Sequence, residues 1–195
     1  MVTSLLMVSC KDGVCSSCVL GKHHRDSFDK HASWHASVPL ELVHSDLCGP
    51  LPSTSFSSFK YFLTFIDDYS RPTWVYFLKL KTKVFNMFLA YKALVEKQSG
   101  HQIIKLRSDN GGEYVKKFTT FYTEQGIQKQ HNVPYTPQQN GVAERNNRTL
   151  KEMVNCMIQS KGLSLQFWAE AMFGYTGYSQ KSKHLKKPLT QQITD

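Results

Sequence analysis

Two aromatic and β-branched runs constrain the fold of this chain more than any other feature. They are residues 61–68 (YFLTFIDD) and 73–80 (TWVYFLKL), and only the four residues YSRP lie between them. Such runs predict β-strands, and so short a connection can join only antiparallel neighbours. We therefore expect a hairpin, and with it a sheet, in the first half of the chain.

The segments around this hairpin alternate between strand and helix patterns. LELVHSD, residues 40–46, predicts a strand that ends at the turn signal LCGP. Apolar residues then recur at helical spacing from Val84 to Val95, before Ser99 and Gly100. The remaining elements expected are a strand (102–109), a short helix (113–126), a short strand (127–133), a loop (134–141), a long amphipathic helix (142–161) and a last helix (163–178). This order predicts an α/β fold, a mixed sheet flanked by helices.

The composition favours a polyanionic partner. With 195 residues and 41% hydrophobic content, the chain can form one ordinary domain with appended segments. Its formal charge of +9 favours nucleic acid first and an acidic membrane surface second, although a merely soluble basic protein has the same charge.

The cysteines and the first residues indicate an intracellular protein without a membrane anchor. No apolar run approaches the roughly 18–20 residues of a membrane helix. MVTSLLMVSC is short and lacks the basic start of a signal peptide. Five cysteines, with Cys48 and Cys156 in unrelated contexts, suit a reducing compartment better than a disulfide framework.

Three carboxylates are candidates for a metal site. Asp46 and Asp109 end predicted strands, and Glu144 begins the long helix. Converging carboxylates repel one another unless cations bind them, and such oxygen ligands suit Mg²⁺ or Mn²⁺, whose pairs serve phosphoryl transfer. Each also has a structural alternative. Asp46 could be a turn residue, Asp109 could cap a turn, and Glu144 could interact with the positive end of the helix dipole. Asp67 and Asp68 compete for the first position, but a strand leading directly into a hairpin favours a structural role.

Two basic residues accompany Glu144. Arg148 and Lys151, four and seven positions further on, share its helical face. They could steer phosphates towards a metal-binding carboxylate, while the alternative is an ordinary solvated face with one charge pair.

An ordered series of motifs resembles the integrase of copia-type LTR retrotransposons. The motifs are HSDLCGP, YFLTFIDDYSRPTWVYFLK, LRSDNGGEY, PYTPQQNGVAERNNRTL and FWAEA, and they cover residues 39–172. The resemblance implies a ribonuclease H-like fold with a mixed five-stranded sheet flanked by helices. It also implies a D-D-E carboxylate set that binds two divalent metals, Mg²⁺ or Mn²⁺, and joins element DNA to host DNA.

Carried over residue by residue, the resemblance assigns the D-D-E set to Asp46, Asp109 and Glu144. It implies DNA 3′-end processing and strand transfer without a covalent protein nucleophile. Element-end and target DNA are the partners, and an active protein would be a homo-oligomer in the nucleus. The DNA-binding residues expected are Gln138, Gln139 and Asn140 of the family's mobile loop, with Arg145, Arg148 and Lys151.

The N-terminal cysteines resemble the end of the family's zinc module. Cys15 and Cys18 form its C-x-x-C, but no histidine pair precedes them, so we expect residues 1–38 to be a zinc-module remnant and linker in which Zn²⁺ is not held. Cys15, Cys18, His31 and His35 also fit zinc-finger spacing. Lys22 stands where such a finger buries an aromatic residue, so we interpret the spacing as coincidence and the two histidines as a solvated linker.

The chain also departs from the family pattern. Thirty-four residues separate Asp109 from Glu144, one fewer than expected, and the sequence after FWAEAM differs. We expect an integrase core at 39–178 and a basic, disordered tail at 179–195. Two alternatives remain open at this point: a catalytically idle nucleic-acid-binding remnant, and a zinc-finger DNA binder on residues 15–35. Enzyme activity is therefore possible rather than assigned.

Overall fold

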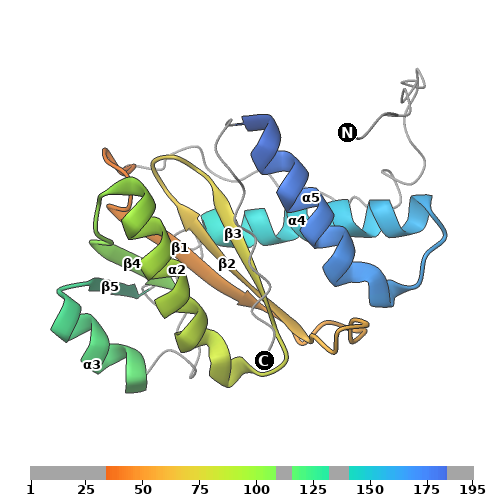
Figure 1. Ribbon diagram of the computed structural model, residues 1–195, viewed down its shortest axis with the longest axis horizontal. Coiled ribbons are helices and arrows are strands. Elements are labelled where there is room, and N and C mark those ends of the chain that lie inside the picture. The colour runs from red at the N-terminus through yellow and green to blue at the C-terminus, as the bar shows by residue number, and fades with distance from the viewer. Residues whose placement is uncertain (1–33, 109–115, 132–140, 184–195) are drawn as a thin grey trace.

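A mixed five-stranded sheet forms the centre of the protein (Figure 1). The computed structural model describes residues 34–108, 116–131 and 141–183. Within them the strand order is β3-β2-β1-β4-β5. The strands are β1 (Leu42–Cys48), β2 (Tyr61–Asp67), β3 (Thr73–Leu78), β4 (Lys105–Ser108) and β5 (Gln128–His131).

The direction of each strand follows from its connection. β1, β2 and β3 pair antiparallel, and the predicted hairpin is confirmed with Phe65 opposite Trp74. β4 pairs parallel to β1, with His44 opposite Arg107, and β5 pairs parallel to β4. Helices precede β4 and β5, as parallel neighbours require crossover connections. The expected α/β, ribonuclease H-like mixed sheet is therefore confirmed.

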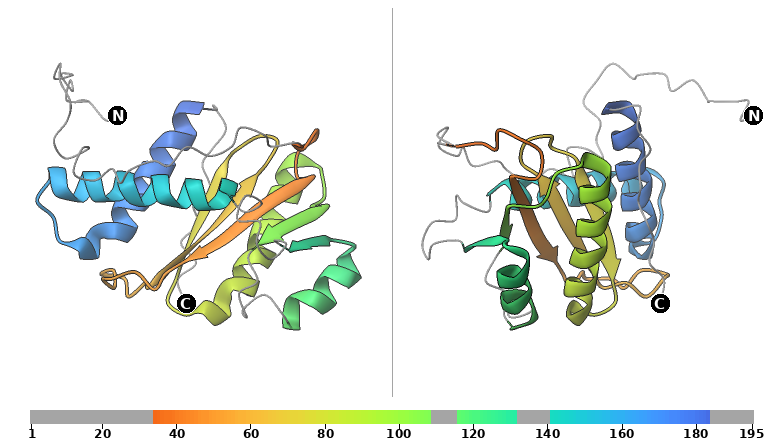
Figure 2. Two further views of the ribbon diagram at one scale, coloured as in Figure 1. Left: turned by 180° about the vertical axis from the view of Figure 1, so that it is seen from behind. Right: turned by 60° about the vertical axis from the view of Figure 1, so that its left-hand side comes forward.

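Helices cover both faces of this sheet (Figure 2). They are η1 (Lys81–Lys83), α2 (Val84–Ser99), α3 (Lys116–Gln125), α4 (Gly141–Ser160), η4 (Leu165–Phe167) and α5 (Trp168–Lys183). α2 ends where Gly100 adopts a left-handed conformation with φ 72°, as its sequence predicts. α5 continues to Lys183, beyond the end at residue 178 that we expected for the last helix. None of the helices in these described ranges has the length and apolar character of a membrane span.

Two hydrophobic cores lie on opposite faces of the sheet. Successive residues of a strand point to opposite faces, and Phe62 and Leu63 of β2 accordingly belong to different cores. The core under α2 and α3 contains Phe65 stacked on Tyr91, with ring centroids 4.4 Å apart. The core under α4 and α5 contains Phe62 beside Trp168. The second core holds α4 against β1 and β2.

The buried side of α4 differs from the expected one. The apolar pattern included Met153 and Met157, but Met157 is 39% exposed. The buried positions after Gly141 follow a four-three-four-four spacing: Ala143, Asn147, Leu150, Val154 and Ile158. A polar residue, Asn147, therefore lies on the face that packs against the sheet.

β1 extends further than its sequence pattern predicted. We expected a strand over residues 40–46, but β1 spans Leu42–Cys48 because pairing with β2 continues to Cys48 opposite Phe62. Asp46 therefore lies within the strand, opposite Thr64, and does not end it.

Candidate active site

Asp46 lies on the face of β1 that α4 covers. Alternation along the strand directs Val43 into the core under α2, whereas Cys48 packs against the core under α4. Asp46 shares the side of Cys48, and its side chain is half-buried. The central strand thus presents a carboxylate to the first half of α4.

Asn147 of α4 contacts this carboxylate directly. Its Nδ2 donates a hydrogen bond to Oδ2 of Asp46 at 2.7 Å, and only 3% of the residue is exposed. Its Oδ1 accepts a hydrogen bond from Oγ1 of Thr64 on β2 at 2.9 Å. The Thr64 hydroxyl donor thereby fixes which end of the amide faces Asp46.

Glu144 lies one helical turn before Asn147. It is exposed in the first turn of α4. Residues three apart on a helix are neighbours, with Cβ atoms about 5–6 Å apart. The contact between Asn147 and Asp46 therefore brings the turn that carries Glu144 to the same side of β1. Arg145, Arg148 and Lys151 are also exposed on α4.

Several residues predicted for the site lie outside the described residues. They are Asp109, Gln138, Gln139 and Asn140, together with Cys15, Cys18 and His31. The last described residue before Asp109 is Ser108, in the strand parallel to β1. Residues 34–108, 116–131 and 141–183 contain no group of three metal-ligating side chains. The contact shown in this region is between the Asp46 strand and α4, through Asn147, and the expected D-D-E set remains a prediction.

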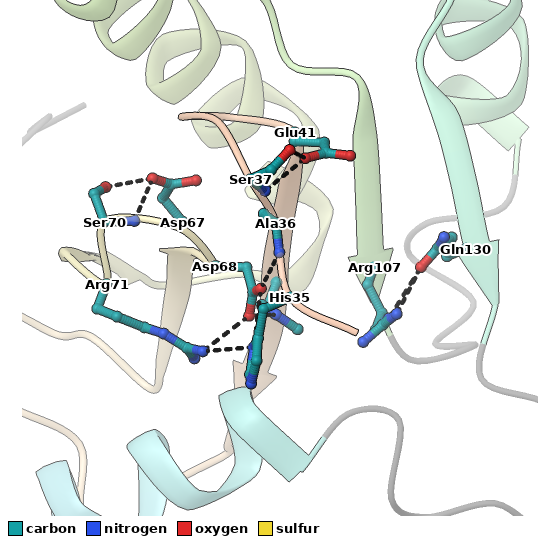
Figure 3. A network of polar contacts seen from close by, with 11 residues as sticks. His35, Ala36, Ser37, Glu41, Asp67, Asp68, Ser70, Arg71, Arg107 and Gln130 are labelled. Atoms are coloured by element: carbon teal, nitrogen blue, oxygen red, sulfur yellow. Dashed lines mark hydrogen bonds and ion pairs between the residues drawn. The ribbon is translucent and has the colours of Figure 1, made fainter. Parts of the chain in front are cut away.

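Asp68 is buried in a polar network, seen in Figure 3. It accepts hydrogen bonds from the Ala36 amide at 2.8 Å and pairs with His44 Nε2 at 3.0 Å. Arg71 Nη2 and His35 Nδ1 each lie 3.4 Å from its carboxylate. Burial acts to raise its pKa, but the Ala36 amide, His44 and Arg71 together lower the pKa of Asp68. These contacts fit the structural role favoured for Asp68.

Asp67 has a parallel role. Its Oδ1 accepts the Leu40 amide at 3.0 Å, and its Oδ2 accepts both the amide and the hydroxyl of Ser70. The two adjacent aspartates thus bind the backbone at Ala36 and Leu40, just before β1. His35, which we expected in a solvated linker, has a side chain that is 57% exposed. Its Nδ1 nevertheless lies 3.0 Å from Arg71 Nη2.

His44 is buried between charged neighbours. Burial lowers its pKa, and the cations of Arg107 and Arg71 act in the same direction, while Asp68 opposes them. Its Nδ1 has no hydrogen-bond partner among the described residues. Arg107 is held in turn by Gln130, whose Oε1 accepts from Nη2 at 2.8 Å (Figure 3). Burial therefore disfavours the charged form of His44, whose Nε2 links β1 to the Asp68 carboxylate.

The sequence pattern did not assign Asn147 and Thr64 to the site. A signal for Asn147 exists: it falls at a buried position of the α4 repeat, where an apolar residue would otherwise pack. Thr64 gives no such signal, because threonine is ordinary in a strand.

The strand order, the mixed pairing and an aspartate on the central strand that meets a glutamate-bearing helix define a ribonuclease H-like domain. Residues 36–137 match the integrase core domain family. The chain belongs to this family.

Relatives from plant retrotransposons extend the match. The chain is 47% identical over 159 residues to the retrovirus-related Pol polyprotein from transposon TNT 1-94 of Nicotiana tabacum, covering 81% of this chain and 12% of that protein. It is 34% identical over 157 residues to the Pol polyprotein from transposon RE2 of Arabidopsis thaliana, covering 80% and 11%. The chain thus spans about an eighth or less of these polyproteins.

A solved structure shows the same fold. It is a simian T-cell lymphotropic virus intasome in complex with PP2A regulatory subunit B56 gamma, with a TM-score of 0.61 and 16% identity. The match covers 91% of this chain and 60% of that chain. The resemblance to a retroviral-type integrase core is therefore confirmed.

Proposed function

We propose that this domain carries out divalent-metal-dependent DNA 3′-end processing and strand transfer with a D-D-E carboxylate set. The observation that carries the proposal is the 2.7 Å hydrogen bond between Asn147 and Asp46. It joins the central strand to the helical turn that bears Glu144. Membership of the integrase core domain family supports DNA integration as the process.

The carboxylates suit the expected metals. Asp46 is half-buried and Glu144 is exposed, so both a fixed and an accessible oxygen ligand are available. Mg²⁺ and Mn²⁺ prefer such oxygen ligands, and Asp109 would complete the set. When bound, a metal pair supplies Lewis-acid stabilisation of the phosphoryl oxygens and lowers the pKa of a bound water.

The chain's own residues would orient the ligands and bind the substrate. Asn147 holds the Asp46 carboxylate in one orientation, and Thr64 holds Asn147. Arg148 and Lys151 would bind DNA phosphates along the exposed face of α4, which predicts weak sequence preference and strong salt dependence. The similar structure is an intasome, which supports the proposal of a homo-oligomer that acts on DNA. A nuclear location is proposed because integration requires access to host DNA.

Metal-dependent cleavage of a labelled element-end duplex tests this function. Asp46→Asn and Glu144→Gln should each abolish Mg²⁺- or Mn²⁺-dependent nicking while DNA binding persists. Glu152→Gln, on the same helix but two turns away, is the matched control and should retain nicking. Undiminished nicking by Asp46→Asn would show that the proposed chemistry is wrong. DNA binding by the wild type with no nicking would instead favour an idle binding domain.

A further inference from the structure

A pocket lies between the end of β1, the segment that follows it, and the helices α4, η4 and α5. Its volume is about 510 Å³, within the range of ligand sites in proteins. The walls are mainly apolar and include Leu51, Leu165, Trp168 and Met172. Two polar side chains of α4, Lys151 and Asn155, complete the lining. The pocket thus combines apolar walls with a cation.

The pocket is built from tied segments. The indole Nε1 of Trp168 donates to the Ser53 carbonyl at 3.0 Å, and the Leu51 amide donates to the Lys60 carbonyl at 2.9 Å. The Phe56 amide donates to the Gln166 carbonyl at 3.2 Å, which joins the same loop to η4. These bonds hold the wall between β1 and β2 in place, so the pocket is formed before any ligand binds.

An exposed polar stripe leads from the carboxylate site to this pocket. Glu144, Arg148, Lys151 and Asn155 are spaced by four, three and four residues, so they share one face of α4, and all four are exposed. At 1.5 Å per residue, Lys151 lies about 10 Å along the helix from Glu144. The cationic part of the stripe ends at the pocket.

The other wall of the pocket begins equally close to the site. Cys48 lines the pocket, and it follows Asp46 by two residues on the same face of β1. Two strand residues span about 7 Å, which is about two stacked nucleotide steps along a DNA strand.

We propose that this pocket takes an unpaired nucleobase of a DNA strand whose phosphates follow the Arg148–Lys151 stripe. The apolar walls bury the base, Lys151 binds the adjoining phosphate, and the sugar-phosphate chain continues to the carboxylates. The proposal rests on the proposed function, because it requires that the α4 face bind DNA. It adds a base-holding subsite that would keep the end of an opened strand out of the reacting position.

Binding of two single strands tests the pocket. Both have about 12 nucleotides, within the range of single-strand sites, and equal charge, but one carries thymine bases and the other is abasic throughout. We expect the wild type to bind the base-bearing strand about tenfold more tightly in fluorescence anisotropy, as one stacked base allows. Leu165→Ala removes a wall residue that is 54% exposed and should lower that preference about threefold or more.

Two further variants separate the pocket from general DNA binding. Leu163→Ala is the matched control, since Leu163 is 46% exposed on the neighbouring turn but does not line the pocket. It should leave the preference unchanged. Lys151→Gln should weaken both strands by the same factor, because it removes only a phosphate contact.

The outcomes distinguish the two proposals. If Leu165→Ala leaves the base preference at the wild-type value while Lys151→Gln weakens both strands, the pocket proposal is overturned. If the wild type binds neither strand in a salt-sensitive manner, the proposed function itself fails.

Discussion

The side-chain amide of Asn147 lies 2.7 Å from the carboxylate of Asp46, although 101 residues separate the two in sequence. Asn147→Ala removes this donor and leaves the carboxylate less firmly oriented. We expect metal-dependent nicking to fall about 10–100-fold, as for other groups that orient a metal ligand. The Mg²⁺ concentration for half-maximal activity should rise as well, and a metal titration measures both effects.

Asn146→Ala is the control for this substitution. The neighbouring side chain, Asn146, accepts a hydrogen bond from the Thr73 hydroxyl on β3 at 3.3 Å and is therefore directed to a different strand from Asn147. Its metal dependence should match the wild type. An Asn147→Ala variant with an unchanged metal dependence would contradict the orienting role.

Asp68→Asn should destabilise the fold, because Asp68 is 4% exposed and pairs with His44 and Arg71. The substitution weakens the buried hydrogen bonds that the carboxylate makes to the Ala36 amide and to His44, so we expect a loss of about 1–3 kcal/mol in the free energy of unfolding. Urea denaturation at pH 7 measures it. Glu124→Gln, an exposed carboxylate of α3, should change stability by less than about 0.5 kcal/mol.

The pH dependence expected for Asp68→Asn follows from the lowered pKa of Asp68 in the wild type. The folded state holds the Asp68 proton less tightly than the unfolded state, whose pKa is near 3.8. The resulting stability is present above that value and is lost as the pH falls through the lower folded-state pKa. Asp68→Asn should therefore show a shallower loss of stability in acid than the wild type. If the unfolding free energy of the two proteins fell equally steeply in acid, the predicted stabilisation by ionised Asp68 would be wrong.

Tyr91→Phe should not harm the fold. The Tyr91 hydroxyl is fully buried without a hydrogen-bond partner in the described part of the chain, while its ring stacks on Phe65. Phenylalanine keeps the stacking and removes the unpaired polar atom, so we expect a gain of about 1 kcal/mol in unfolding free energy at pH 7. Tyr69→Phe, at a 52% exposed position, is the control and should be neutral.

Tyr91 also determines how we expect the stability of the fold to change at alkaline pH. Burial raises its pKa well above 10.0 in the folded state. The unfolded chain thus ionises first, and stability falls as the pH rises above about 10. The phenylalanine variant should lose less stability than the wild type between neutral pH and pH 11. A steeper loss in the variant would exclude this assignment.

Gly49→Ala should be more damaging than Gly100→Ala. Both glycines have positive φ, 133° and 72°, so each substitution brings backbone strain of about 1–3 kcal/mol. A Cβ at Gly49 would also lie 2.7 Å from the Lys60 carbonyl oxygen, whereas nothing lies within 4 Å at Gly100. Thermal unfolding compares Gly100→Ala, which adds backbone strain alone, with Gly49→Ala, which adds strain and a steric clash. Equal melting temperatures would show that the loop after β1 moves enough to relieve the clash.

The sequence predicted many of the strands and helices because neighbouring residues determine where these elements form and end. The hairpin between β2 and β3 follows from two β-prone runs with a short connection, and the end of α2 follows from Gly100. The extension of β1 to Cys48 could not be predicted from the local sequence. The last residues of β1 are held by pairing with β2, and the turn signal after Asp46 does not determine that pairing.

The sequence named the candidate carboxylates but not the contacts around them. Asp46 and Glu144 were proposed from their places in the predicted elements and from their motifs, and their catalytic roles remain predictions. The pairing of Asn147 with Thr64 depends on how α4 packs across the sheet, and no local pattern specifies that distance. The assignment of Asp109 remains a prediction, since it lies outside the described residues.

The 101-residue span of the Asp46–Asn147 contact also bears on when the domain becomes competent during its synthesis. Contacts between distant residues require the closure of long loops and form late in folding. A nascent chain that has produced the whole sheet but not yet α4 holds Asp46 without Asn147 or Glu144. If the proposed function holds, metal-dependent nicking would therefore begin only after α4 has docked on the sheet.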